Sequence, residues 1–247
     1  MVIGFIGAGS MASAMARGWR GSVEGMLFTD SGSGRASELA REVEGEALDS
    51  NADLAGRADL VVLAVKPSGL GAVAEEVGDV AKPVVSLLGA TPLASVVAAF
   101  PAADVCRVMP NVAVEVCRGV LCVAGGESAE TRGMLERLGR VVDLPDEQFD
   151  AATAVMGCAP AYLALAVEAL ADAGAEAGLA EDLARELVVE TAAGTAELLR
   201  RRHPSDVRRA VASPGGSTEA GLEALDRGGA REAFEEAVRA SLQRMRG

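Results

Sequence analysis

The chain has 247 residues, of which 23 are basic and 36 are acidic, so its formal net charge at pH 7 is −13. This charge argues against a surface for nucleic acid or an anionic membrane, and we expect neither as a partner. Half of the residues are hydrophobic but only 3% are aromatic, which predicts a core of alanine, valine and leucine. The length suits one large domain or two smaller ones.

The four cysteines include no C-x-x-C pair, and the one histidine, His203, has no paired ligands nearby. The sequence therefore predicts no metal site, and it favours a reducing, cytoplasmic location. Met1 leads directly into an apolar strand, and no apolar run reaches membrane-spanning length without a glycine or a charge. We therefore expect neither a signal peptide nor a transmembrane segment.

The first twelve residues hold the most informative motif. Residues 2–6 form an apolar run, typical of a strand buried on both faces, which continues into Gly7-Ala8-Gly9-Ser10-Met11-Ala12. This is the Gly-x-Gly-x-x-Gly/Ala fingerprint of dinucleotide-binding folds. Gly7 permits the tight turn, Gly9 lets a pyrophosphate approach the backbone, and the helix from Ser10 points unpaired N–H groups at the phosphates. We therefore expect a dinucleotide to bind at Gly7, Gly9, Ser10 and Met11.

The next predicted strand, residues 26–29, ends at Asp30, a position where an acid commonly binds the ribose hydroxyls of NAD. The segment Ser31-Gly32-Ser33-Gly34-Arg35 follows at once. It would suit a small anion-binding loop in which Arg35 binds a 2′-phosphate, and this favours NADP. The sequence leaves the choice open, so NADP(H) is the expected cofactor and NAD(H) is the alternative.

Helices and strands continue to alternate as far as residue 144. Predicted helices cover residues 35–44, 93–100 and 128–138, and predicted strands cover residues 59–65, 82–88, 104–109 and 140–144, with strand-like residues also at 112–123. Asn51 precedes a short helix and is expected to cap it. Pro67 holds Lys66 extended after a buried strand, so we expect Lys66 at the crevice where such sheets bind ligands.

From residue 149 onward the strand pattern gives way to alanine-rich amphipathic helices, at about residues 150–156, 159–173, 181–201, 205–211, 217–225 and 230–244. A helical half this thin, with apolar residues on several faces, needs a partner to bury them. The sequence therefore predicts a Rossmann-type doubly wound α/β domain over residues 1–148 and an all-α dimerisation and substrate domain over residues 149–247. We expect a homodimer or a larger even-numbered homo-oligomer.

Several stretches are informative together, because they occur in a fixed order along almost the whole chain. They are Gly4-Phe5-Ile6-Gly7-Ala8-Gly9-Ser10-Met11, Asn51, Ala64-Val65-Lys66-Pro67, Arg107-Val108-Met109-Pro110-Asn111, Ala159-Pro160-Ala161-Tyr162, Glu168-Ala169-Leu170-Ala171-Asp172-Ala173-Gly174 and Ser213-Pro214-Gly215-Gly216-Ser217-Thr218. In these stretches the chain resembles the pyrroline-5-carboxylate reductase family. Two stretches depart from the family pattern: Val112-Ala113 replaces its Thr-Pro, and Met156-Gly157-Cys158-Ala159 replaces its usual Ser-Gly-Ser-Gly.

The resemblance implies a two-domain NAD(P)H enzyme that reduces 1-pyrroline-5-carboxylate, a cyclic imine, to L-proline in proline biosynthesis. It implies that Asn51 and Lys66 lie near the ribose and nicotinamide portions of the cofactor. The same site is expected to include Ala64, Val65, Pro67 and Asn111. The resemblance also implies that the carboxylate and ring of a small-molecule substrate bind at Ser213, Gly215, Gly216, Ser217 and Thr218.

The chemistry of the segment 213–218 is compatible with such a role. Ser217 and Thr218 open a helix after two glycines, so N–H groups converge there as in an anion-binding nest, although a tight turn between helices is the simpler interpretation. A protonated imine is already electrophilic, so its reduction is mainly a positioning task, and a hydrogen bond between the Thr218 hydroxyl and the ring nitrogen is the expected catalytic contact. The alternatives are a reductase of another cyclic imine, a β-hydroxyacid-type dehydrogenase and a non-catalytic dinucleotide sensor.

Overall fold

The computed structural model describes residues 1–246. The chain forms two compact units, one of Met1–Cys158 with the residues from Met245 onward, and one of Ala159–Arg244. The division falls after Cys158, whereas the strand pattern of the sequence ends before residue 149. The assignment of cofactor binding to residues 1–148 and of substrate binding to residues 149–247 stays a prediction.

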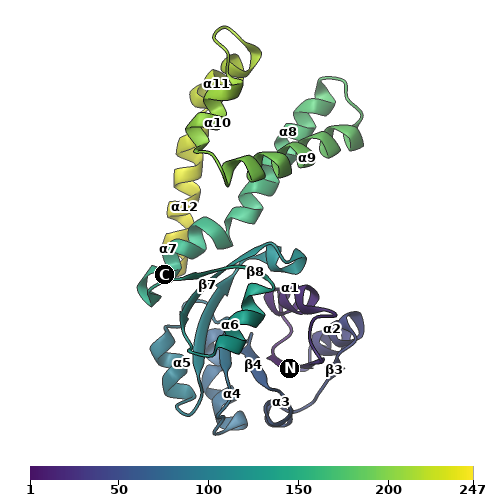
Figure 1. Ribbon diagram of the computed structural model, residues 1–247, viewed down its shortest axis with the longest axis vertical. Coiled ribbons are helices and arrows are strands. Elements are labelled where there is room, and N and C mark those ends of the chain that lie inside the picture. The colour runs from purple at the N-terminus through teal and green to yellow at the C-terminus, as the bar shows by residue number, and fades with distance from the viewer. Residues whose placement is uncertain (247) are drawn as a thin grey trace. The chain divides into compact units, whose positions relative to one another are not determined.

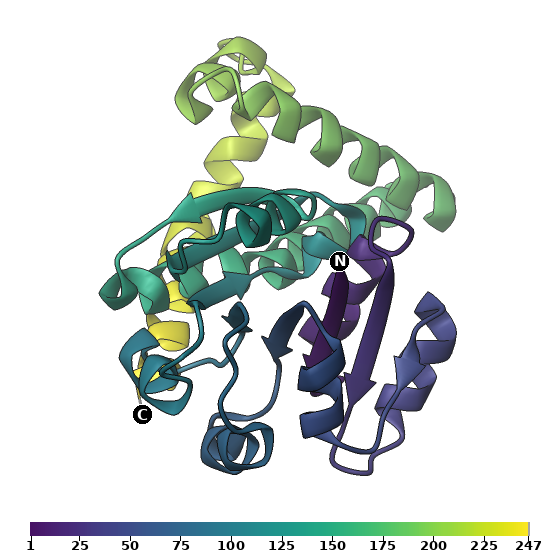
Figure 2. The same cartoon turned by 60° about the horizontal axis from the view of Figure 1, so that its bottom comes forward.

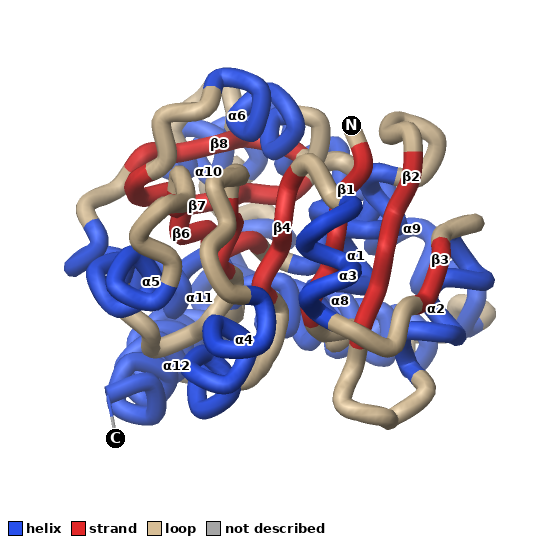
Figure 3. Tube along the Cα trace, turned by 90° about the horizontal axis from the view of Figure 1, so that it is seen from below, coloured by secondary structure: helices blue, strands red, loops and turns tan. Residues whose placement is uncertain are grey.

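The first unit is built on an eight-stranded sheet with the order β3-β2-β1-β4-β5-β6-β7-β8, which Figure 3 shows from below. Neighbouring strands are parallel except β6 and β7, which are antiparallel. The chain reverses its direction of winding between β1 and β4, and such a reversal leaves a crevice at the carboxyl ends of the strands. The expected doubly wound α/β fold is confirmed. The strands are β1 (Val2–Ile6), β2 (Gly25–Thr29), β3 (Glu46–Ala47), β4 (Leu60–Leu63), β5 (Val84–Ser86), β6 (Val105–Pro110), β7 (Gly119–Gly125) and β8 (Gly139–Asp143).

Helices cover both faces of this sheet (Figure 1), because successive strand residues point to opposite faces and both sets are apolar. Ile3 and Phe5 pack in a cluster with α1, α2 and α6, whereas Ile6 and Leu63 pack in a second cluster with α3, α4 and α5. The helices are α1 (Ser10–Trp19), α2 (Arg35–Val43), α3 (Asn51–Arg57), α4 (Leu70–Val77), α5 (Leu93–Ala99), α6 (Ala129–Glu136) and α7 (Phe149–Ala152), with short turns η1 (Pro67–Gly69), η2 (Val112–Val116), η3 (Asp146–Gln148) and η4 (Thr153–Gly157).

Four local features differ from the sequence expectations. Ser50, not Asn51, caps α3, because the Ser50 hydroxyl accepts the Asp53 N–H while Asn51 is already the first helical residue. The strand-like residues 112–116 form the 3₁₀ turn η2, and β7 begins only at Gly119. The expected helix over residues 150–156 is α7 followed by one π-helical turn, η4, and α4 was not expected.

The second unit consists of helices only, as expected: α8 (Ala159–Glu176), α9 (Glu181–Leu199), α10 (Pro204–Val211), α11 (Ser217–Arg227) and α12 (Ala230–Arg246). Figures 1 and 2 show α8 and α9 side by side. The hydroxyls of Tyr162 and Ser241 lie 2.6 Å apart and join α8 to α12. Among residues 159–245, Ala184 is the only one that is fully buried. Leu163, Leu165 and Leu170 are each more than 60% exposed, so this unit has almost no core of its own.

One segment, Asp146–Glu176, contains a window that is long enough and apolar enough to span a membrane by length and composition alone. Only 6% of that window is buried within the chain. The segment also contains Gly157 and Glu168. Its exposed leucines indicate that another surface covers this segment, and a measurement of the oligomeric state tests whether that surface is a second copy of the chain.

Candidate active site

The fingerprint turn between β1 and α1 lies against the end of β4. Gly7 has φ +103°, and a Cβ there would stand 2.5 Å from the carbonyl oxygen of Ala64, so the position admits only glycine. The Ala64 N–H donates to the Ile6 carbonyl over 2.8 Å, which brings Ala64 and Val65 to the turn. A Cβ on Gly9, by contrast, would meet nothing within 4 Å. The backbone at Gly9 is therefore open to a ligand.

The helix after this turn can receive an anion. Its N-cap, Gly9, has no side chain to satisfy the free N–H groups of the first turn, and that turn carries no acidic residue. Ser10 is exposed at the start of α1, Met11 is half-buried, and Ala12 is fully buried against the sheet. An open glycine beside uncapped N–H groups fits the pyrophosphate of a dinucleotide.

Asp30, at the end of β2, uses both carboxylate oxygens within its own loop. One oxygen accepts the N–H groups of Gly32 and Ser33 at 2.7 and 3.0 Å, and the other accepts the Ala36 N–H and the Ser33 hydroxyl at 2.8 and 2.9 Å. These hydrogen bonds, that of Ala36 first, hold the pKa of the Asp30 carboxyl below its usual range. In this state Asp30 shapes the segment from Ser31 onward, and its oxygens are not free for ribose hydroxyls.

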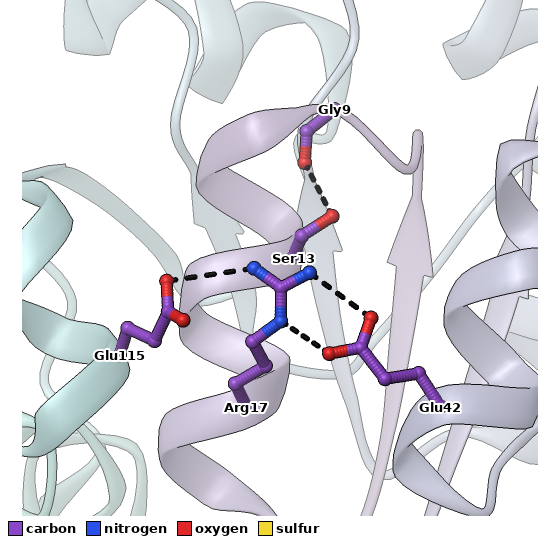
Figure 4. Close-up of polar contacts among 5 residues, drawn as sticks. All are labelled: Gly9, Ser13, Arg17, Glu42 and Glu115. Atoms are coloured by element: carbon purple, nitrogen blue, oxygen red, sulfur yellow. Dashed lines mark hydrogen bonds and ion pairs between the residues drawn. The ribbon is translucent and has the colours of Figure 1, made fainter.

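A cavity of about 490 Å³ opens beside the fingerprint, between α1, α2 and η2. Arg17 forms part of the cavity wall. Its guanidinium pairs with both oxygens of Glu42 at 2.5 and 3.0 Å and lies 3.4 Å from Glu115 (Figure 4). The Glu42 carboxylate is the main reason that the pKa of Arg17 is raised. Arg35 and Ser10 line the same cavity. Arg35, at the start of α2, thus borders the space next to the dinucleotide turn.

Asn51 is held on two sides at the same edge of the sheet. The Thr29 hydroxyl donates to its Oδ1 at 2.6 Å, and Glu76 on α4 accepts both its backbone N–H, at 2.9 Å, and its Nδ2, at 2.7 Å. The carbonyl of Thr29 accepts the Gly7 N–H at 3.0 Å, so Asn51 is connected through one residue to the fingerprint. Glu76 is not among the residues predicted from the sequence, because its helix α4 was not expected.

Three further predicted cofactor residues follow strands β4 and β6 of the sheet. Lys66 and Pro67 are exposed after β4, where the Lys66 carbonyl accepts the Gly69 N–H at 2.9 Å and closes η1. Asn111 follows β6, and its amide is used within the fold. Its Oδ1 accepts the Val120 N–H at 3.1 Å, and its Nδ2 donates to the Met156 carbonyl at 3.2 Å. Asn111 therefore joins β7 to η4, and a cofactor contact by this residue stays a prediction.

In the second unit, the segment from Ser213 to Thr218 forms the tight turn before α11. Gly215 has φ +72°, and the Gly216 N–H donates to the Ser213 carbonyl at 2.9 Å. The Gly215 N–H donates to the Glu219 carboxylate at 2.6 Å, so the turn already holds a carboxylate. Gly216 caps α11 without a side chain, which leaves N–H groups of Ser217 and Thr218 unpaired within the helix. Thr218 is exposed.

Comparison with known proteins agrees with both halves of this description. Residues 146–247 match the family model for pyrroline-5-carboxylate reductase dimerisation, and residues 2–89 match that for coenzyme F420-dependent NADP oxidoreductases. The pyrroline-5-carboxylate reductase of Synechocystis is 34% identical over 98% of this chain and 96% of its own length. The enzyme of Thermus thermophilus is 35% identical over 99% of this chain and 97% of its own length.

Solved structures agree as well. The 1-pyrroline-5-carboxylate reductase of Streptococcus pyogenes superposes with a TM-score of 0.88 at 30% identity, covering 99% of this chain and 98% of its own. The Plasmodium falciparum enzyme, solved with NADP bound, superposes with a TM-score of 0.87 at 25% identity, covering 99% and 97%. A fingerprint turn, a helical half without its own core and a Pro-Gly-Gly turn thus occur in a chain that aligns with these reductases from end to end. The chain belongs to the pyrroline-5-carboxylate reductase family.

Proposed function

We propose that the protein reduces 1-pyrroline-5-carboxylate to L-proline with NADPH, as the last step of proline biosynthesis. The observation that carries the proposal is the end-to-end match to reductases of this name, at 34–35% identity, in a chain that retains the open fingerprint turn and the Pro-Gly-Gly turn. No lysine occurs in α8, the first long helix of the second unit, where a β-hydroxyacid-type dehydrogenase would normally carry one.

In this reaction the residues of the chain bind the cofactor and the substrate and orient them for hydride transfer. The uncapped N–H groups of α1 hold the pyrophosphate, and the turn at residues 213–218 holds the substrate carboxylate on backbone N–H groups. When bound, the reduced nicotinamide supplies the hydride. The Thr218 hydroxyl hydrogen-bonds the imine nitrogen, and water delivers the proton. The hydrogen bond that the Gly215 N–H donates to the Glu219 carboxylate supports the carboxylate role, because here an N–H group of the turn already binds a carboxylate.

The direct test is NADPH oxidation measured against a panel of cyclic imines that carry a carboxylate. We expect the highest kcat/KM with 1-pyrroline-5-carboxylate and formation of L-proline as the product. Higher kcat/KM with a six-membered imine would reassign the substrate while leaving the reaction class intact. Cofactor binding without turnover of any imine would contradict the proposal.

Arg35 is expected to bind the 2′-phosphate of NADPH. It is exposed at the start of α2 and lines the cavity beside Ser10, while the nearby Asp30 carboxylate accepts hydrogen bonds within its own loop. Arg35→Ala should therefore lower kcat/KM for NADPH by about tenfold, the size of one charge-assisted hydrogen bond, and leave the value for NADH unchanged. Arg41→Ala is the matched control, because Arg41 is exposed on the same helix and its side chain hydrogen-bonds the Ser37 carbonyl. An unchanged NADPH value in Arg35→Ala would remove this role.

The exposed leucines of α8 and α9 support a homodimer or a larger even-numbered assembly formed through the second unit. We propose that a second copy, and not a membrane or a nucleic acid, covers them, and that the protein works in the cytoplasm. The match of residues 146–247 to a dimerisation module supports this choice. Light scattering at micromolar concentration should give at least twice the mass of the chain, and an active monomer would overturn the proposal.

A further inference from the structure

The fold leaves open which group fixes the cofactor's adenosine ribose. In doubly wound folds that ribose lies at the end of the second strand, which here is Thr29 followed by Asp30. Both carboxylate oxygens of Asp30 already accept hydrogen bonds from its own loop. Asn51 is the next polar side chain at this edge, since its Oδ1 accepts the Thr29 hydroxyl.

The orientation of the Asn51 amide is set by Glu76. A carboxylate only accepts hydrogen bonds, so the amide atom that faces Glu76 at 2.7 Å must be the nitrogen. The oxygen therefore faces Thr29, whose hydroxyl donates to it at 2.6 Å. With the amide reversed, its oxygen would face the carboxylate and be repelled. The second Glu76 oxygen holds the Asn51 backbone N–H at 2.9 Å, so the carboxylate fixes both the main chain and the side chain.

This arrangement leaves part of the hydrogen-bonding capacity of the Asn51 amide unused. One lone pair of Oδ1 and one hydrogen of Nδ2 have no partner among the described residues. They are one acceptor and one donor, which suit a ribose hydroxyl because a hydroxyl both donates and accepts a hydrogen bond. Their directions depend on Glu76, although Glu76 itself is exposed on α4, 25 residues away in sequence.

We propose that Glu76 is a positioning residue for cofactor binding: its carboxylate locks the Asn51 amide in the one orientation that hydrogen-bonds the adenosine ribose. The inference rests on the proposed function for the identity of the cofactor. It differs from a direct role of Glu76, because a free carboxylate near the 2′-phosphate of NADPH would weaken binding by repulsion. The two roles therefore predict opposite effects when the charge is removed.

Fluorescence titration of NADPH and of NADH, without substrate, tests the proposal in Glu76→Gln. The glutamine amide can pair with either orientation of Asn51, so the lock is lost. We expect the dissociation constants of both cofactors to rise by about five- to tenfold, because the adenosine ribose of both carries a free 3′-hydroxyl. KM for the cofactor should rise in parallel while kcat stays near the wild-type value. Glu75→Gln, which removes the neighbouring exposed charge on α4, should leave both dissociation constants unchanged.

A double-mutant cycle with Asn51→Ala separates positioning from general structural support. If Glu76 acts through Asn51, Glu76→Gln adds no further loss of affinity in the Asn51→Ala background. The proposal would be overturned by tighter NADPH binding in Glu76→Gln. It would also be overturned by an unchanged dissociation constant with a lowered melting temperature, or by additive losses of affinity in the cycle. Turnover of 1-pyrroline-5-carboxylate is measured separately, so a wrong substrate leaves this test intact. A wild-type protein that binds no dinucleotide would overturn both.

Discussion

Replacing Asp146 with alanine is expected to lower the free energy of unfolding by about 2–3 kcal/mol, because the change leaves the buried Arg107 without its counter-ion. The Arg107 side chain on β6 is 6% exposed, and its Nη1 lies 2.6 Å from Asp146 Oδ1. The guanidinium also lies 4.5 Å from the centre of the Phe149 ring. The expected loss of stability is small for a broken buried ion pair, because Asp146 itself is 29% exposed.

Asp146 has a second partner, which adds to the expected loss. Its Oδ2 accepts the Leu93 N–H at 2.9 Å, at the start of α5, so the side chain holds α5, β6 and the segment leading into α7 together. Denaturant unfolding at matched protein concentration measures the change. Glu147→Ala, at the next and exposed carboxylate, should stay within about 0.5 kcal/mol of wild type.

A double variant tests the physical cause. In Asp146→Ala combined with Arg107→Met, no charge is left buried without a partner, so stability should recover part of the loss seen in Asp146→Ala. A loss below about 0.5 kcal/mol in the single variant would mean that water replaces the carboxylate at Arg107. No recovery in the double variant would assign the loss to the Leu93 hydrogen bond.

Much of the first unit could be predicted because its strands are buried on both faces. Runs such as residues 2–6 and 60–63 are apolar without interruption, so the strands can be inferred locally, and the predicted helix after the first run also indicates parallel winding there. The direction of β7 could not be inferred. It pairs antiparallel with β6 after η2, and nothing in residues 112–123 distinguishes a partner on one side from one on the other.

The fingerprint was predictable for the same reason, since Gly7 and Gly9 act through their own backbone. The surroundings of Asp30 and Asn51 were not. From the sequence, the Asp30 carboxylate is expected to bind a ribose. In the structure it accepts hydrogen bonds from Gly32, Ser33 and Ala36, and that geometry exists only in the folded loop. Asn51 depends on Glu76 in α4, a helix whose eight residues follow Pro67 without a polar cap to mark their start.

Replacing Thr218 with valine is expected to lower kcat by about 10- to 1,000-fold, the usual range when one hydrogen bond to the reacting group is lost. Valine keeps the shape of threonine and removes only the hydroxyl. Thr218 is exposed in the first turn of α11, after a Gly-Gly pair that lets a ligand approach the backbone. No other acid in the turn is free to reach an imine nitrogen in the same way, because the Glu219 carboxylate already binds the Gly215 N–H.

The kinetic constants separate this role from a binding role. With Thr218→Val, kcat and kcat/KM for the imine should fall together, because the lost contact is made mainly in the transition state. The dissociation constant for NADPH should not change, since the fingerprint lies in the other unit of the chain. Ser217→Ala, one residue earlier in the same exposed turn, should reduce kcat by less than about threefold. Full activity in Thr218→Val would remove Thr218 from the chemical step and leave protonation to water alone.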